Sequence, residues 1–240
     1  ILQYPKHNQS KMILKLIWRN LWRNSRRTLI TMASIAFAVL FAVLMKSFQD
    51  GVFNNLIKNV VGYYSGYVQI HQKGYWDEQI LDNSFELKKE LNNQLQQNHQ
   101  ITAIVPRLET FVLASKGNTT KGCLLVGTDA VRENKLTQLK SKLIKGSYFK
   151  NNEATVLIAE GLAKRLEVSF SDTIVLFGQG FHGVMAAGKY KIKGIIHLAS
   201  PEMNAAFVYL PLTATQSFLS AENRLTSVSL GIDDPENTDV

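Results

Sequence analysis

An uncharged apolar run from Thr28 to Met45 constrains this chain more than any other stretch. It is 18 residues long, with Arg26 and Arg27 before it and Lys46 after it. At about 1.5 Å per residue, a helix of this length covers roughly 27 Å, close to the ~30 Å hydrocarbon core of a bilayer. The run therefore predicts a transmembrane helix. The alternatives are a buried helix of a soluble protein and a cleaved signal peptide.

The residues after the run favour an anchor over a signal peptide, because residues 46–50 are a poor cleavage context. Apolar and polar residues then continue at helical spacing on opposite faces. We predict one helix over residues 28–61, roughly 50 Å long, which leaves the bilayer as a stalk. Phe48, Val52 and Leu56 represent its apolar face. Periodicity leaves two roles open, a rigid stalk that transmits motion and a helix that packs on the next domain.

Basic residues are concentrated before the span. The net charge is +8, and residues 1–27 contain seven of the 27 Lys and Arg residues and no acid, which leaves 20 basic against 19 acidic residues afterwards. Because the cytoplasmic flanks of membrane spans are enriched in Lys and Arg, this asymmetry predicts a cytoplasmic N-terminus and an extracytoplasmic main domain. The basic charge is thus a topology signal, and we expect no nucleic acid as a partner.

The arm formed by residues 1–27 has its apolar positions on one helix face, which is typical of a helix that lies in the cytoplasmic membrane interface. Tryptophan suits the headgroup level, and each basic side chain near anionic lipid adds about 1 kcal/mol of attraction. Membrane lipids are therefore expected partners of this arm. The interfacial residues we predict are Trp18, Trp22, Arg19, Arg23, Arg26 and Arg27. Ile1 and Met12 both stay open as the natural start.

Residues 62–240 alternate between strand-like and short helical patterns, which predicts an α+β domain behind one membrane helix. The predicted strands are 67–71, 101–114 with a break at Pro106, 121–126, 154–159, 173–177, 187–197, 206–210 and 225–232. The predicted helices are 85–97, 160–166 and 211–219, with another opening at 234–236. Residues 131–145 are expected to be exposed and weakly helical.

Two strings in the sequence resemble cofactor-binding motifs, but the residues that follow them do not fit such sites. Residues 178–183 spell G-x-G-x-x-G and residues 183–189 approach a P-loop, but strand-like sequence follows where each motif needs a helix N-terminus. The glycines are better explained as a connection between antiparallel strands. We therefore expect no catalytic residue, cofactor site or metal site in this chain. Cys123, the one cysteine, is expected to be a small core residue.

The order of parts resembles the start of a bacterial ABC transporter permease of the FtsX-like kind, which includes MacB-type and lipoprotein-releasing exporters. The resemblance rests on WRNLWRNSRRT at 18–28, on SGYVQIHQKGYWDE at 65–78, and on an outer-domain pattern. The residues that match this pattern are Glu160, Gly161, Leu162, Ala163, Leu166, Val168, Asp172 and Thr173. Ser171 stands where the family usually has glycine, so that turn is expected to differ.

The resemblance implies a permease of the bacterial inner membrane with four transmembrane helices and a large periplasmic domain between the first two. It implies a dimer with a second permease copy or a paralogue, and a separate cytoplasmic ATPase that holds ATP and Mg²⁺. Residues 62–113 and 222–240 would form a porter-like part, and residues 114–221 an inserted α/β subdomain. On this basis we expect the chain to be truncated at its C-terminus.

The implied function is that ATP hydrolysis by the partner drives periplasmic movements, which extrude or release a lipoprotein, a peptide or a small molecule. This chain would then not itself be an enzyme. The main alternative is a single-span sensor or binding module. A membrane-anchored periplasmic enzyme is a third class, and it needs a polar pocket that the sequence does not reveal.

Overall fold

The computed structural model describes residues 6–60 and 64–233, and it describes side chains over 12–52 and 64–233. The chain divides into two compact units, residues 1–56 and 57–240. The helix that the sequence predicts at 234–236 lies outside the described residues.

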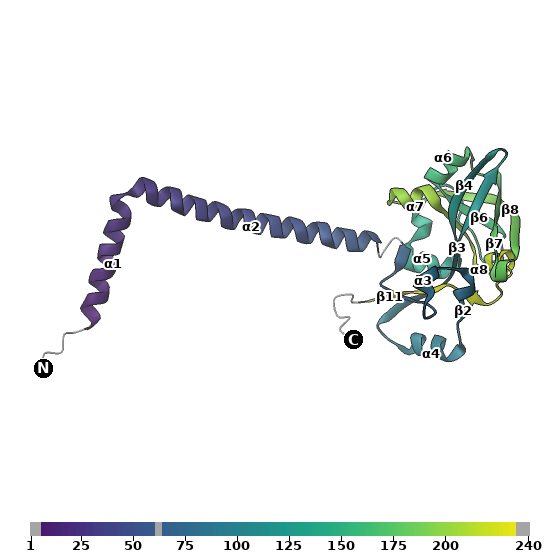
Figure 1. Ribbon diagram of the computed structural model, residues 1–240, viewed down its shortest axis with the longest axis horizontal. Helices are drawn as coiled ribbons and strands as arrows, with labels where there is room; N and C mark the ends of the chain where they lie inside the picture. The colour runs from purple at the N-terminus through teal and green to yellow at the C-terminus, as the bar shows by residue number, and fades with distance from the viewer. Residues whose placement is uncertain (1–5, 61–63, 234–240) are drawn as a thin grey trace. The chain divides into compact units, whose positions relative to one another are not determined.

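The N-terminal unit consists of two helices, α1 (Lys6–Arg23) and α2 (Ser25–Val60). They meet at Asn24, whose carbonyl accepts hydrogen bonds from the backbone amides of Arg27 and Thr28. The Thr28 hydroxyl also donates to the carbonyl of Leu21, 2.8 Å away, in the last turn of α1. Figure 1 shows α2 as one uninterrupted helix. The predicted continuity of span and stalk is therefore confirmed, and Gly51 does not break the helix.

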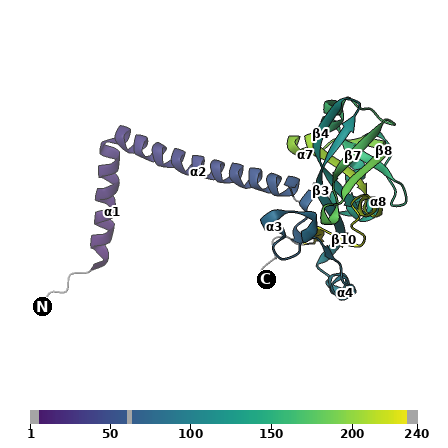
Figure 2. The ribbon, with the colours of Figure 1, turned by 45° about the vertical axis from the view of Figure 1, so that its right-hand side comes forward.

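The second unit is built on six strands that form a closed barrel. Each strand pairs with the next until the last returns to the first, and Figure 2 shows β3, β7 and β8 side by side along one wall. In order around the barrel the strands are β3 (Ile101–Lys116), β4 (Thr119–Thr128), β9 (Phe207–Pro211), β6 (Thr155–Ala159), β8 (Met185–Ile196) and β7 (Thr173–Gln179).

Alternate residues of the six strands fill the barrel, because successive side chains of a strand point to opposite faces. Each strand contributes buried apolar residues, such as Val112 and Ala114 from β3 and Ile174 and Leu176 from β7. Cys123 belongs to the same cluster, as the sequence predicts. Helix α6 (Glu160–Leu166) adds Leu162, Ala163 and Leu166 to this core.

Further elements surround the barrel. The short strands β1 (Val68–Ile70) and β11 (Ser227–Ile232) extend the sheet beyond β3, and β5 (Leu143–Gly146) pairs with β8. A separate two-stranded ribbon joins β2 (Phe85–Glu86) to β10 (Arg224–Leu225). The remaining helices are α3 (Tyr75–Glu78), α4 (Lys89–Gln97), α5 (Ala130–Thr137), α7 (Pro201–Ala206) and α8 (Leu212–Phe218), with 3-10 turns η2 (Leu81–Asn83), η3 (Leu139–Lys142) and η4 (Phe181–Gly183).

Three predictions about these elements are wrong in detail. The helix expected over 85–97 begins only at Lys89, because its first residues pair with β10. Strand β3 runs through Pro106 without a break. Pro106 opposes Val228, and the pairing with β4 begins only at the next residue, so one side of the strand is unpaired there and tolerates a proline. Pro211 ends β9 rather than opening α8.

The stretch 131–145 is helical as predicted in α5 and η3, but its last three residues belong to strand β5, and it is not uniformly exposed. Glu133, Thr137 and Leu139 are buried, because α5 and η3 pack against the outer side of the barrel. The glycine-rich segment 178–183 connects the antiparallel strands β7 and β8, as expected. The proposed division into two subdomains stays a prediction, and its first boundary falls inside β3.

Candidate functional site at the span and the root of the stalk

The apolar run that the sequence predicts as a membrane span lies in α2, and its apolar side chains are exposed. One helix among the described residues is long and apolar enough to cross a bilayer, over Ser25–Val52, and none of its apolar window is buried. Two hydroxyls of the apolar run bond within the helix, because Thr31 donates to the carbonyl of Arg27 and Ser34 to that of Ile30. Such bonding suits a helix in a medium that offers no hydrogen-bond partners.

The predicted interfacial residues lie on both sides of the junction at Asn24. Trp18 and Trp22, one turn apart on α1, have ring centroids 6.1 Å from each other and are exposed. Arg19 and Arg23 lie on α1, and Arg26 and Arg27 open α2; all four are exposed. These six residues lie within positions 18–27 of the chain. Their contact with a membrane interface stays a prediction.

The predicted stalk residues lie on α2 beyond the apolar run. Phe48 is 70% exposed and Val52 is 43% exposed. Leu56 is part of α2, and its side chain is outside the described set. An exposed ion pair joins Lys46 to Asp50 over 2.7 Å, one turn apart. A charged pair at this position indicates that the helix has reached water, because an ion pair in hydrocarbon is costly.

Tyr64 lies four residues after the end of α2 and is the first residue of the barrel unit whose side chain is described. The Tyr64 hydroxyl donates a 2.6 Å hydrogen bond to Oε1 of Glu109 on β3. The Arg107 guanidinium lies over the Tyr64 ring, 4.7 Å from its centroid, and the ring of Phe207 meets it edge-on at 4.9 Å. Three contacts of different kinds therefore hold Tyr64 against the barrel wall.

Arg107 extends this contact to helix α5. Its Nε and Nη2 donate to the two carboxylate oxygens of Glu133 on α5, over 2.9 and 2.7 Å, and both side chains are fully buried. The hydroxyls of Thr128 and Thr137 each donate to the same carboxylate over 2.9 Å. Such bidentate, charge-assisted bonding is the arrangement that makes a buried ion pair tolerable. We call Tyr64, Arg107, Glu109 and Glu133 the stalk-root cluster.

The pKa values of this region follow from burial and charge. Burial and the Glu109 carboxylate raise the pKa of Tyr64 well above its ordinary value, so its hydroxyl stays protonated. Burial would lower the pKa of Arg107, but Glu133 and Glu109 outweigh it and raise that pKa. Burial lowers the pKa of Lys142 to about 8, although Glu133 opposes this change. Tyr64 therefore stays protonated and Arg107 stays charged near neutral pH.

Sequence reasoning missed the stalk-root cluster. Arg107 and Glu109 lie two residues apart on the same face of β3, and Glu133 lies one turn from Thr137 on α5. Two charged residues on one face of a largely apolar strand were the available signal, because charged residues are rarely buried without a partner. Arg107 and Glu133 are 26 positions apart in the sequence, and Tyr64 and Glu109 are 45 positions apart. Local periodicity does not reveal contacts over such separations.

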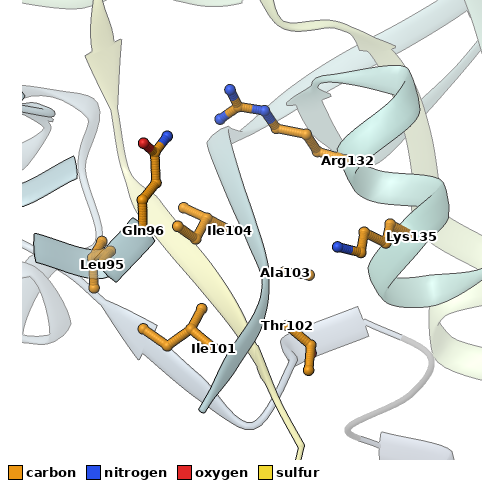
Figure 3. Close-up of a pocket in the computed structure, with 8 residues that line it drawn as sticks. All are labelled: Leu95, Gln96, Ile101, Thr102, Ala103, Ile104, Arg132 and Lys135. Atoms are coloured by element: carbon orange, nitrogen blue, oxygen red, sulfur yellow. The ribbon is translucent and has the colours of Figure 1, made fainter. Parts of the chain in front are cut away.

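A hollow of about 300 Å³ lies elsewhere on this unit, between α4 and α5. Figure 3 shows Arg132 and Lys135 projecting from α5 toward it, with Leu95 and Gln96 of α4 on the other side. The first residues of β3, from Ile101 to Ile104, line the remainder. Among the described residues, no group of three His, Cys, Asp or Glu side chains is placed to hold a metal ion.

Comparisons with known proteins agree with this architecture. The periplasmic region of MacB from Actinobacillus actinomycetemcomitans is similar, with a TM-score of 0.51 and 15% identity over 77% of this chain and 82% of that one. The extracellular domain of the noncanonic ABC-type transporter YknZ from Gram-positive bacteria matches with a TM-score of 0.48 and 16% identity over 63% and 74%. A search of the curated proteins found no match. The model of the MacB-like periplasmic core domain matches residues 28–240. This match covers most of the sequence, and the chain therefore belongs to the MacB-like periplasmic core domain family.

Proposed function

We propose that this chain is the permease subunit of a bacterial ABC transporter, and that α2 carries motion from a separate cytoplasmic ATPase to the extracytoplasmic barrel unit. The continuity of α2 over 36 residues carries this proposal. At about 1.5 Å per residue the helix is roughly 54 Å long, well beyond a ~30 Å hydrocarbon core. A helix without an internal break is stiff enough to transmit a displacement along its axis.

The stalk-root cluster supports the same role. A moving helix acts on a domain only if its end is fixed to that domain. Tyr64 lies four residues after the end of α2 and is bound to Glu109 and Arg107, and Arg107 is bound to α5 through Glu133. Displacement of Tyr64 would therefore act on the barrel wall and on a surface helix together.

The remaining parts of the proposal concern topology and partners. The basic arm favours a cytoplasmic N-terminus and a barrel unit on the outer side of the inner membrane. ATP and Mg²⁺ belong to the partner ATPase, and a second permease copy or a paralogue completes the transporter. The substrate is a lipoprotein, a peptide or a small molecule that the barrel unit extrudes or releases.

The test uses the full-length protein, co-purified from membranes with its ATPase partner and reconstituted in lipid. A fluorophore on Phe111→Cys reports movement of the barrel unit, because Phe111 is 73% exposed whereas Cys123 is buried, with its pKa raised to about 12 by burial. ATP is expected to change the fluorescence. Failure of any ATPase to co-purify would favour a single-span sensor or binding module instead.

Helix continuity is tested by Asn54→Pro, with Asn54→Ala as its control. Proline inside a helix removes a backbone bond and costs about 3 kcal/mol or more, whereas alanine preserves the helix. The proline variant is expected to hydrolyse ATP and to lose the fluorescence change, and the alanine variant to retain both. A full fluorescence change in the proline variant would show that α2 does not transmit motion.

The fastening of the stalk is tested by Tyr64→Phe, with Tyr67→Phe as its control. The first substitution deletes the hydroxyl that bonds Glu109, and the second deletes an exposed hydroxyl. Only Tyr64→Phe is expected to weaken the ATP-dependent change while leaving ATP hydrolysis intact. Equal responses in the two variants would rule out a special role for Tyr64.

A further inference from the structure

The hollow between α4 and α5 combines an apolar wall with two cations. Leu95 of α4 and Ile101 and Ile104 of β3 are half-buried and line one side. Arg132 and Lys135 are exposed on α5 and line the other (Figure 3). Its volume of about 300 Å³ lies at the lower end of the range of small-molecule sites.

The two cations are available to a ligand. In residues 12–52 and 64–233, no carboxylate forms an ion pair with Arg132 or Lys135. Residues three apart on a helix are neighbours about 5–6 Å apart at their Cβ atoms, so one anionic group can meet both.

The neighbouring acidic side chains do not supply the anionic group that pairs with Arg132 and Lys135. Glu133, between the two cations in sequence, is buried and bound to Arg107 on the other side of α5. Asp233 bonds through its backbone amide to Gln100 and is not among the residues that line the hollow.

We propose that this hollow binds a small amphiphile, with its anionic head group between Arg132 and Lys135 and its apolar chain against Leu95, Ile101 and Ile104. The charge complementarity selects an anion, and the apolar wall selects a molecule with a hydrocarbon part. An acidic peptide satisfies the cations but leaves the apolar wall exposed. The site is independent of the proposed transport function, because binding at it needs neither the ATPase nor ATP.

The test is isothermal titration calorimetry of the full-length protein in phosphatidylcholine nanodiscs, with octanoate as the probe and empty nanodiscs as the blank. Octanoate is expected to bind saturably. The neutral alcohol 1-octanol and the short anion acetate are expected to bind at least tenfold more weakly. Octanol has no charge to pair with the two cations, and acetate has no hydrocarbon chain to cover the apolar wall. Octanoate binding no tighter than about 10 mM would overturn the proposal.

Two variants locate the site. The double substitution Arg132→Gln and Lys135→Gln is expected to weaken octanoate binding at least tenfold. The matched control, Lys140→Gln with Lys145→Gln, removes two exposed lysines that do not line the hollow and is expected to leave binding unchanged. Thr102→Trp, which places a large ring in the hollow, is also expected to weaken binding. Equal affinity in all variants, or a hexaglutamate peptide that binds as tightly as octanoate, would overturn the proposal.

Discussion

The guanidinium of Arg107 and the carboxylate of Glu133 form a two-point ion pair in which both side chains are completely buried. Arg107 lies on β3 and Glu133 on α5, so the pair fixes a surface helix to the barrel wall. One guanidinium nitrogen, Nη1, is buried without a hydrogen-bond partner and lies 3.7 Å from Oε1 of Glu109. The guanidinium of Arg107 therefore lies between the carboxylates of Glu133 and Glu109.

Removing one charge of this pair is expected to be costly. Glu133→Gln leaves the Arg107 cation buried without its counter-charge, and such a change typically costs about 3–5 kcal/mol. The control is Glu153→Gln, which breaks a partly exposed pair with Lys193 and is expected to cost about 1 kcal/mol or less. Chemical denaturation of the full-length protein in detergent measures both. Equal losses would mean that the buried pair contributes little to stability.

Two glycines on β4 provide a matched test of packing around the barrel. A Cβ atom at Gly127 would lie 2.5 Å from the side chain of Thr215 on α8, whereas a Cβ at Gly122 meets nothing within 4 Å. Gly127→Ala is therefore expected to lower the free energy of unfolding by about 1–3 kcal/mol through overpacking. Gly122→Ala is expected to be neutral or to stabilise slightly, because alanine restricts the unfolded chain more than glycine does. Similar melting temperatures would contradict this account.

The turn before β7 contains a residue in a strained conformation. Ser171 has a φ angle of +74°, in the left-handed region that favours glycine. Ser171→Gly is expected to raise the free energy of unfolding by about 1 kcal/mol, because the Cβ atom is the source of the strain.

Ser169→Gly is the control for this turn. The amide of Ser169 donates to Asp172, and its φ is not positive, so glycine brings no relief there and is expected to destabilise by its added freedom. Thermal unfolding of both variants distinguishes the two effects. A lower melting temperature for Ser171→Gly would show that the hydroxymethyl group itself matters.

The lowered pKa of Lys142 predicts that the free energy of unfolding depends on pH. Burial lowers its pKa from 10.5 to about 8 in the folded protein. Between these values the unfolded chain binds a proton that the folded chain does not, so the free energy of unfolding contributed by this group rises with pH from about 8 upward. Denaturation of the wild type and of Lys142→Met at pH 7.5 and 9.5 isolates the effect. The wild type is expected to gain stability relative to the variant, and an unchanged difference would contradict the lowered pKa.

The local parts of the fold were accessible from the sequence. The continuous α2 follows from an apolar run that passes into an amphipathic pattern, and α6 begins and ends at the predicted residues Glu160 and Leu166. Ser171 was recognised as a residue in place of a usual glycine, and its positive φ explains why the position favours glycine. These features depend on neighbours within a few turns, and such neighbours are visible in the order of residues.

The sequence alone determined the membrane helix, its extension and the α+β class, because hydrophobic periodicity and charge asymmetry act along the chain. The tertiary structure decided which residues surround Tyr64 in the barrel unit. The barrel closes because β3 pairs with both β4 and β7, and this closure brings Arg107 and Glu109 next to Tyr64 and Glu133. Contacts between residues so far apart in sequence depend on how the strands pair around the barrel, and the periodicity of a single segment does not contain that information.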